Sequence, residues 1–129
     1  MTGLRLSRLG KTWLIDIDGV LVRHNGHKQC GHKQGGDQLL PGVTEFFARL
    51  EPDDRVVLLS ARSEAEREAT LAALERFGLR WDHALFGLPT GERICINDRK
   101  PSGLTTSLAV NLDRDAGLGG IDVVIDPHL

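Results

Sequence analysis

Short runs of apolar residues, each ending at a polar residue, recur along the chain. Three of them, at residues 12–17, 55–60 and 93–97, hold three or more consecutive apolar side chains. Runs of this length without alternation are typical of strands buried on both faces, as in a parallel sheet covered by helices. Two weaker runs, at 107–112 and 122–125, are further strand candidates.

Two helices are expected between the strands. Residues 43–50 follow Pro41-Gly42 and place their apolar side chains on one helical stripe. The second helix begins with Ser63 and Glu66 in capping-box spacing and ends near Gly78, a natural helix stop. The alternation of strands and helices predicts an α/β fold, a Rossmann-like three-layer sandwich with a central, mostly parallel sheet. We expect one domain over residues 1–129.

Composition narrows the classes of function. The chain has 129 residues, 40% of them hydrophobic and 26% charged, which is ordinary for one globular domain. Its net charge of −2 argues against a non-specific nucleic-acid binder. Two cysteines are too few for a disulfide scaffold, and no apolar run approaches the roughly 20 residues of a membrane span. The expected setting is the cytoplasm, with no membrane partner.

Polar side chains stand at the end of each of the three strong strand candidates. Asp16 and Asp18 end the first, Ser60 ends the second, and Asn97 and Asp98 end the third. In open α/β sheets ligands bind at the carboxyl ends of the strands. Three carboxylates at one sheet edge repel one another unless a cation lies among them, and hard oxygen ligands suit Mg²⁺. The pattern therefore predicts a magnesium site.

The Asp-x-Asp spacing adds a chemical reading. Residues two apart in a strand point to the same side, so Asp16 and Asp18 can face one crevice, and Gly19 permits a sharp turn after them. One carboxylate can attack phosphorus while the other exchanges a proton with the leaving oxygen. This division of labour is typical of a covalent aspartyl-phosphate route.

Three segments in order resemble the motifs of the haloacid dehalogenase superfamily of phosphatases, and the likeness covers roughly residues 12 to 101. They are Asp16-Ile17-Asp18-Gly19-Val20-Leu21, Leu58-Leu59-Ser60-Ala61-Arg62 and Ile96-Asn97-Asp98-Arg99-Lys100-Pro101. The first is specific when it follows a strand, and the other two gain weight from their order and spacing. The resemblance implies a phosphatase, that is, a Mg²⁺-dependent hydrolase of phosphoric monoesters acting through an aspartyl-phosphate.

The resemblance also implies roles for single residues. Asp16 matches the nucleophile and a Mg²⁺ ligand, and Asp18 matches the general acid/base, with its carbonyl as a second metal ligand. Ser60 matches the hydroxyl that hydrogen-bonds the transferring phosphoryl group. Asp98 matches the metal-binding carboxylate, while Asn97, which replaces a second acid, can offer an amide oxygen. Positioning and charge neutralisation dominate phosphoryl transfer, so this set is chemically coherent.

The resemblance further implies a cation that screens the nucleophile's charge. No lysine lies between Lys33 and Lys100. Lys100 is therefore the first candidate and Arg93 the second, while Arg62 is a candidate substrate contact.

Residues 23–38, rich in Gly, His, Lys and Gln, read as a flexible loop that stands in place of a cap. We expect the loop to face the substrate, with His27 as a contact. Two other readings stay open. One is a solvated loop without a role, and the other is a zinc site made by the loop's imidazoles and thiol, His24, His27, Cys30 and His32.

The spacing of the motifs leaves no room for a cap domain, which resembles the cap-less group of the superfamily. Such members take large substrates in an open cleft or complete the site from a neighbouring subunit, so a homo-oligomer is expected. The resemblance to small phosphatases of this superfamily implies a sugar phosphate or similar small phosphorylated metabolite as substrate. The alternatives are a nucleotide or polynucleotide 3′-phosphatase, prompted by Ser60-Ala61-Arg62, and a non-catalytic protein that binds a phosphorylated ligand or a partner.

Overall fold

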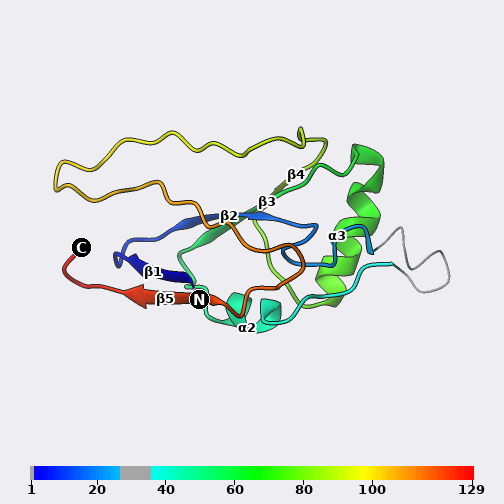
Figure 1. Cartoon of the computed structure of the whole chain (residues 1–129), viewed down its shortest axis with the longest axis horizontal. Helices are drawn as coiled ribbons and strands as arrows, with labels where there is room; N and C mark the ends of the chain where they lie inside the picture. Colours follow the sequence, from blue (N-terminus) through cyan, green and yellow to red (C-terminus); the bar gives the residue numbers. More distant parts are fainter. Residues whose placement is uncertain (1, 27–35) are drawn as a thin grey trace.

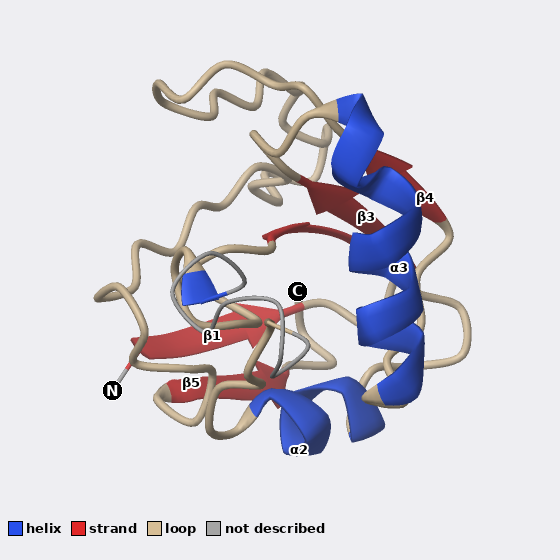
Figure 2. Ribbon diagram, turned by 90° about the vertical axis from the view of Figure 1, so that its right-hand side faces the viewer, coloured by secondary structure: helices blue, strands red, loops and turns tan. Residues whose placement is uncertain are grey.

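Two parallel sheets form the framework of the chain, which makes the fold an α/β fold of low helix content. A computed structural model describes residues 2–26 and 36–129. The first sheet pairs β1 with β5, and the second has the order β2-β3-β4. Figure 2 shows the two sheets as separate layers, with α3 running along one side. The described elements are β1 (Thr2–Leu6), β2 (Thr12–Asp16), α2 (Val43–Ala48), β3 (Arg55–Leu59), the 3₁₀ helix η2 (Glu64–Glu66), α3 (Arg67–Arg76), β4 (His83–Leu85) and β5 (Ile121–Ile125).

The pair β2–β3 confirms two of the predicted strands. It runs in parallel register from Thr12 beside Arg55 to Asp16 beside Leu59. One face is buried in the core, which it shares with α2 and with Leu118 and Ile121. On the opposite face Leu14 is half exposed. An uninterrupted apolar run thus does not mean here that both faces are covered.

The two predicted helices are present with modified starts. The α2 helix begins after Gly42, whose φ of 78° lies in the left-handed region. The predicted capping box at Ser63 starts the 3₁₀ helix η2 instead, and its side chain makes no capping bond. The predicted stop is confirmed, since Gly78 has a φ of 81° and its N–H donates to the Glu75 carbonyl. Among the described residues, no helix is long and apolar enough to cross a bilayer.

The predictions of strands at 93–97 and 107–112 are wrong. Both stretches belong to the segment 88–112, which holds no helix or strand. This segment, yellow to orange in Figure 1, runs away from the carboxyl end of β3 and folds back on itself. Ile94 and Ile96 are 80% and 93% exposed. The local pattern favours a strand, but a strand needs a neighbour to accept its hydrogen bonds, and the structure gives this stretch none in the described residues.

The β1–β5 pair joins segments from distant parts of the chain. The predicted strand at 122–125 is confirmed as β5, whereas β1 was not predicted. The loop before β5 packs on the start of α2, where Leu118 N–H donates to the Pro41 carbonyl at 3.0 Å. Gly117 has a φ of 82°, and a Cβ there would overlap the Pro41 carbonyl oxygen. Only glycine fits this close approach.

Asp54 ties the turn before β3 to the start of β2. Its buried carboxylate accepts hydrogen bonds from Lys11 N–H and Trp13 Nε1–H, each at 2.9 Å, and a longer one from Glu51 N–H. Burial raises the pKa of the Asp54 carboxyl, but the N–H donors outweigh it and hold the pKa below the usual 3.8. The ionised form is therefore favoured more strongly in the folded protein than in the unfolded chain.

We expect Asp54 to make folding stability depend on acid pH. A lowered folded pKa contributes stability that is fully present above pH 3.8 and is lost as the pH falls through the folded value. Asp54→Asn should lower the free energy of unfolding at pH 7 by about 1–3 kcal/mol, because buried N–H donors lose a charged acceptor. Urea unfolding of both proteins at neutral and acid pH measures this, and the difference between them should shrink in acid. An undiminished difference in acid would contradict the assignment.

Candidate active site

The carboxyl ends of β2 and β3 bring acidic and basic side chains together. Asp16 is the last residue of β2, and its Oδ1 accepts a hydrogen bond from Ile17 N–H at 2.8 Å. Gly19, with a φ of 82°, then turns the chain so that its N–H donates to the Val22 carbonyl. This tight turn holds Asp18 beside the end of β3. The predicted convergence of these two strand ends is present.

Asp16 carries the accessible carboxylate of the site. Its side chain is 43% exposed, and Arg93 Nη2 lies 3.9 Å from its Oδ1 in a loose ion pair. Burial raises the pKa of the Asp16 carboxyl above its usual value, although the Ile17 N–H and the Arg93 charge oppose the rise. The nearby Asp18 carboxylate adds to it. Asp16 is thus exposed enough to meet a ligand and sits beside a cation.

Asp18 and Asp37 share the guanidinium of Arg62. Arg62 donates to Asp18 Oδ2 from Nε at 2.9 Å and to Asp18 Oδ1 from Nη2 at 2.7 Å. It donates to Asp37 Oδ2 from Nη1 at 3.0 Å and to Asp37 Oδ1 from Nη2 at 2.8 Å. The Arg62 and Asp37 side chains are only 4% and 6% exposed. Although burial disfavours the charged guanidinium, the two carboxylates raise the pKa of Arg62 well above its usual range.

A fifth hydrogen bond gives a partner to the last N–H group of the Arg62 guanidinium. Arg62 Nη1 also donates to Thr70 Oγ1 on α3, at 2.9 Å. A guanidinium has five N–H donors, and each of those of Arg62 therefore has a partner within the chain. As the side chains lie in this structure, Arg62 has no N–H left for a phosphate. Its place is beside Asp18 rather than on the open surface of the site.

Ser60 lies beneath this network rather than on its surface. The residue is fully buried, and its Oγ accepts a hydrogen bond from Arg62 N–H at 3.0 Å. Its own N–H donates to the Leu85 carbonyl, and its carbonyl accepts from Leu88 N–H. The hydroxyl therefore fixes the backbone that carries Arg62.

The residues of the third motif lie elsewhere. Asn97, Asp98 and Lys100 are exposed and belong to the segment 88–112. The Asp98 carbonyl accepts from Thr106 Oγ1, and Lys100 N–H donates to the Leu104 carbonyl, so both residues are held in a local turn. Figure 1 shows this turn at the opposite end of the molecule from the carboxyl end of β2. Of the two candidate screening cations, the structure places Arg93 beside Asp16.

The donors placed here do not make a magnesium site as they stand. The Asp16 carboxylate is 43% exposed and the Asp18 carbonyl lies two residues further on, but Asn97 and Asp98 belong to the exposed segment 88–112, whose turn lies away from the carboxyl end of β2. Across residues 2–26 and 36–129, no three side chains of His, Cys, Asp or Glu gather as a possible metal site. The structure therefore supplies no complete set of ligands for the ion that the sequence predicts.

The predictions made for the loop at residues 23–38 concern, for the most part, residues outside the described part of the chain. His27, Cys30 and His32 lie outside the described residues, so neither the substrate contact nor the zinc alternative meets a test. His24 is described, and its N–H donates to Asp115 Oδ1 at 2.7 Å.

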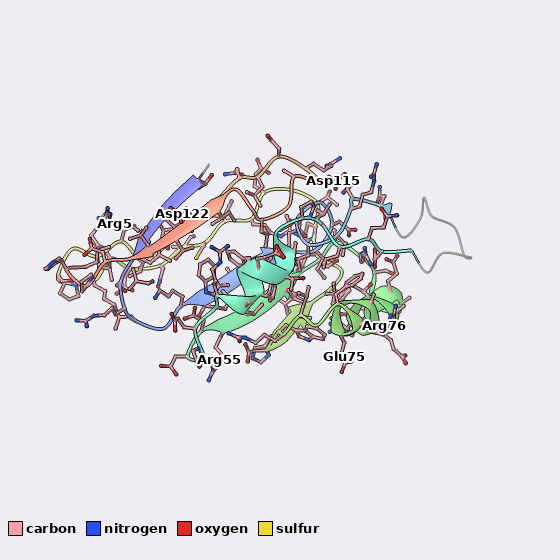
Figure 3. All side chains as sticks on the ribbon, turned by 90° about the horizontal axis from the view of Figure 1, so that it is seen from below. Arg5, Arg55, Glu75, Arg76, Asp115 and Asp122 are labelled. Carbon is pink, nitrogen blue, oxygen red and sulfur yellow. The ribbon has the colours of Figure 1, made fainter. Side chains whose placement is uncertain are left out.

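Sequence reasoning missed two acidic residues at this site. Asp37 lies at the end of a polar loop and Asp115 in a polar turn, where acids are common on solvent-exposed surfaces. Asp115 has a φ of 66°, and its N–H donates to the Gly19 carbonyl. Figure 3 labels it beside the turn that follows β2. Nothing in the local pattern separates these acids from solvated ones, because their partners are distant in sequence.

Comparison of the chain with protein-family models, with curated proteins and with solved structures found no match. What is established is an α/β fold with parallel sheets and, at the ends of β2 and β3, a site made of carboxylates and guanidinium groups.

Proposed function

We propose that the protein is a Mg²⁺-dependent phosphomonoesterase that works through an aspartyl-phosphate on Asp16. The observation that carries the proposal is the placement of Asp16. It ends a parallel strand, keeps an exposed carboxylate, and has the Arg93 cation and the Asp18 carboxylate as neighbours. The carboxyl ends of parallel strands are where such folds bind ligands. The ordered motifs of the haloacid dehalogenase phosphatases support the same reading.

The chain's own residues account for the chemistry as follows. An Asp16 oxygen attacks phosphorus and forms an acyl phosphate, while the bond from phosphorus to the ester oxygen breaks. The leaving oxygen takes a proton from Asp18, which later takes one from the water that hydrolyses the acyl phosphate. To carry this proton, one Asp18 oxygen must release its hydrogen bond from Arg62 while the other oxygen keeps its own. Arg93 offsets the negative charge that gathers beside Asp16. The resemblance assigns Ser60 a hydroxyl contact with the phosphoryl group, but Ser60 is fully buried and its Oγ accepts from Arg62 N–H, so the structure as it stands gives the hydroxyl a supporting place behind Arg62 instead.

The proposal also requires the third motif to move. Mg²⁺ would neutralise charge on the phosphoryl oxygens, and the resemblance names Asp16, the Asp18 carbonyl, Asp98 and Asn97 as its ligands. Asp98 and Asn97 must then approach Asp16. Support comes from β2, which is an edge strand in the described sheet, and from residues 93–97, an exposed apolar stretch of matching length. Pairing them would add a strand to the β2-β3-β4 sheet, a step toward the larger central parallel sheet that the sequence predicts.

The proposed substrate is a sugar phosphate or a similarly small metabolite, and a 3′-phosphorylated nucleotide or polynucleotide is the second enzyme candidate. The placement of Asp98 away from Asp16 favours one candidate of another class. In it, the protein binds a phosphorylated ligand without hydrolysing it. An exposed free thiol at Cys95 suits the reducing cytoplasm that we propose as its setting.

Hydrolysis of p-nitrophenyl phosphate tests the proposal, with and without Mg²⁺ and then with a chelator. We expect turnover that depends on Mg²⁺ and disappears on chelation. A panel of sugar phosphates, nucleotides and 3′-phosphorylated oligonucleotides then separates the substrate classes by kcat/KM. If the folded protein hydrolyses no member of the panel and yet binds one of them, the proposal of an enzyme is wrong and that of a binding protein takes its place.

A further inference from the structure

We propose that Asp37 is a positioning residue, which fixes the plane of the Arg62 guanidinium and thereby the direction of the Asp18 carboxylate. The inference rests on the proposed function, because Asp18 matters for turnover only if the site transfers a phosphoryl group. Asp37 itself is not assigned a contact with substrate.

The geometry of the two ion pairs carries the inference. A guanidinium is planar and offers different edges to its partners. Asp18 occupies the edge formed by Nε and Nη2, and Asp37 occupies the edge formed by Nη1 and Nη2. Both carboxylates bind with two oxygens, so each defines a direction in the plane of the guanidinium. With both edges held, Arg62 cannot turn about its long axis without breaking two ion pairs.

The anchors come from separate parts of the chain. Asp18 lies in the turn after β2, Arg62 follows β3, and Thr70 lies on α3. The Ser60 hydroxyl accepts from Arg62 N–H and holds the backbone at the base of the side chain. Asp37 adds a fourth segment to this set. The direction of the Asp18 carboxylate is therefore set by contacts among elements that the fold already holds in place.

Charge balance argues that Asp37 does more than neutralise a buried cation. Asp18 alone neutralises Arg62, and its two oxygens already form the pair. A second carboxylate that is 6% exposed adds a like charge beside Asp18 and has to leave water. What Asp37 supplies is a partner for the second edge of the guanidinium, and this contribution is to the orientation of Arg62 rather than to its charge. Misplacing a reacting group by about 1 Å can cost on the order of a hundredfold in rate, so this geometry matters for catalysis.

The test is Asp37→Asn, assayed on p-nitrophenyl phosphate with Mg²⁺. The amide keeps the size of the side chain but turns one acceptor into a donor that faces Arg62. We expect kcat to fall about 10- to 100-fold while KM stays within about threefold, because substrate does not touch Asp37. Asp37→Glu, which restores both acceptor oxygens, should recover part of kcat. The matched control is Glu64→Gln, which breaks the exposed two-oxygen pair between Glu64 and Arg67 and should leave kcat unchanged.

A second measurement does not depend on activity. In ¹⁵N-labelled protein, hindered rotation of the Arg62 guanidinium should give separate Nη resonances, which should merge in Asp37→Asn but not in Glu64→Gln. If the wild type hydrolyses nothing, the proposed function fails, and the NMR spectra still decide whether Asp37 fixes Arg62. If the wild type is active and folded Asp37→Asn keeps its kcat, the positioning role is overturned. Unchanged Arg62 resonances in Asp37→Asn would overturn it as well, whatever the activity.

Discussion

Asp16→Asn is expected to abolish turnover of p-nitrophenyl phosphate, with a loss on the order of a thousandfold or more. An amide oxygen is too weak a nucleophile to form the acyl phosphate, so the covalent route is closed. The fold should survive, since the amide oxygen can still accept the hydrogen bond from Ile17 N–H. Initial rates at saturating substrate, together with the melting temperature, measure the two effects separately.

The control for this variant is Asp122→Asn. Asp122 is an exposed acid on β5, in the other sheet (Figure 3). Asp122→Asn should lose no activity. This result would show that the loss in Asp16→Asn does not come from removing just any negative charge. Full activity in Asp16→Asn, together with loss of activity on chelation of Mg²⁺, would mean that the nucleophile is a different group or a metal-activated water. Trapping a phosphorylated chain by acid quench in the wild type, and failing to trap it in the variant, would complete the assignment.

Arg62→Met is expected to produce the largest loss of stability, about 3–5 kcal/mol in the free energy of unfolding. Methionine fills much of the space but leaves Asp18 and Asp37 facing each other without their shared cation. These carboxylates, of which Asp18 is 18% and Asp37 6% exposed, would repel each other and are largely withdrawn from water. Urea unfolding at neutral pH measures the loss, and the slope of the transition tests whether the unfolding remains two-state.

Two further variants show where the loss comes from. Adding Asp37→Asn to Arg62→Met removes one of the two stranded charges and should restore part of the stability. Arg5→Met breaks an ion pair with Asp126 in which the Arg5 side chain is 67% exposed, and it should change stability little. If Arg62→Met were no more harmful than Arg5→Met, the network around Arg62 would be structurally unimportant, and its role in placing Asp18 would be doubtful too.

The sequence predicted those elements whose partners are other predicted elements. The runs at 12–17 and 55–60 became β2 and β3, because each supplies the other with hydrogen bonds in register. The stretch at 93–97 has the same local pattern, and yet it lies in an extended, exposed segment. Periodicity records which side chains prefer burial, but it holds no information about which neighbour is available. The strand β1 was not predicted from the sequence, because only its pairing with β5 defines it as a strand.

The site was predicted in part for the same reason. Asp16, Asp18, Ser60 and Arg62 converge because parallel strands end at one edge, and that rule can be applied to a sequence. The role of each charge could not be predicted, since it depends on partners. The sequence predicts Arg62 as a substrate contact, whereas in the structure its N–H groups donate to Asp18, Asp37 and Thr70. The shared use of one guanidinium by two acids that are far apart along the chain has no local signature.

The segment 88–112 has fixed points at both of its ends. Leu88 N–H donates to the Ser60 carbonyl, and just beyond its other end Asp115 N–H donates to the Gly19 carbonyl. Between these bonds, the turn around Pro101 contributes no strand or helix to either sheet. Doubling the length of a flexible loop costs only about 0.6 kcal/mol in closure entropy. For folding, the turn is therefore a permissive insertion point, where a peptide tag or a small reporter domain can be grafted beyond Pro101, clear of Asn97 and Asp98, while the two anchors and both sheets keep their places.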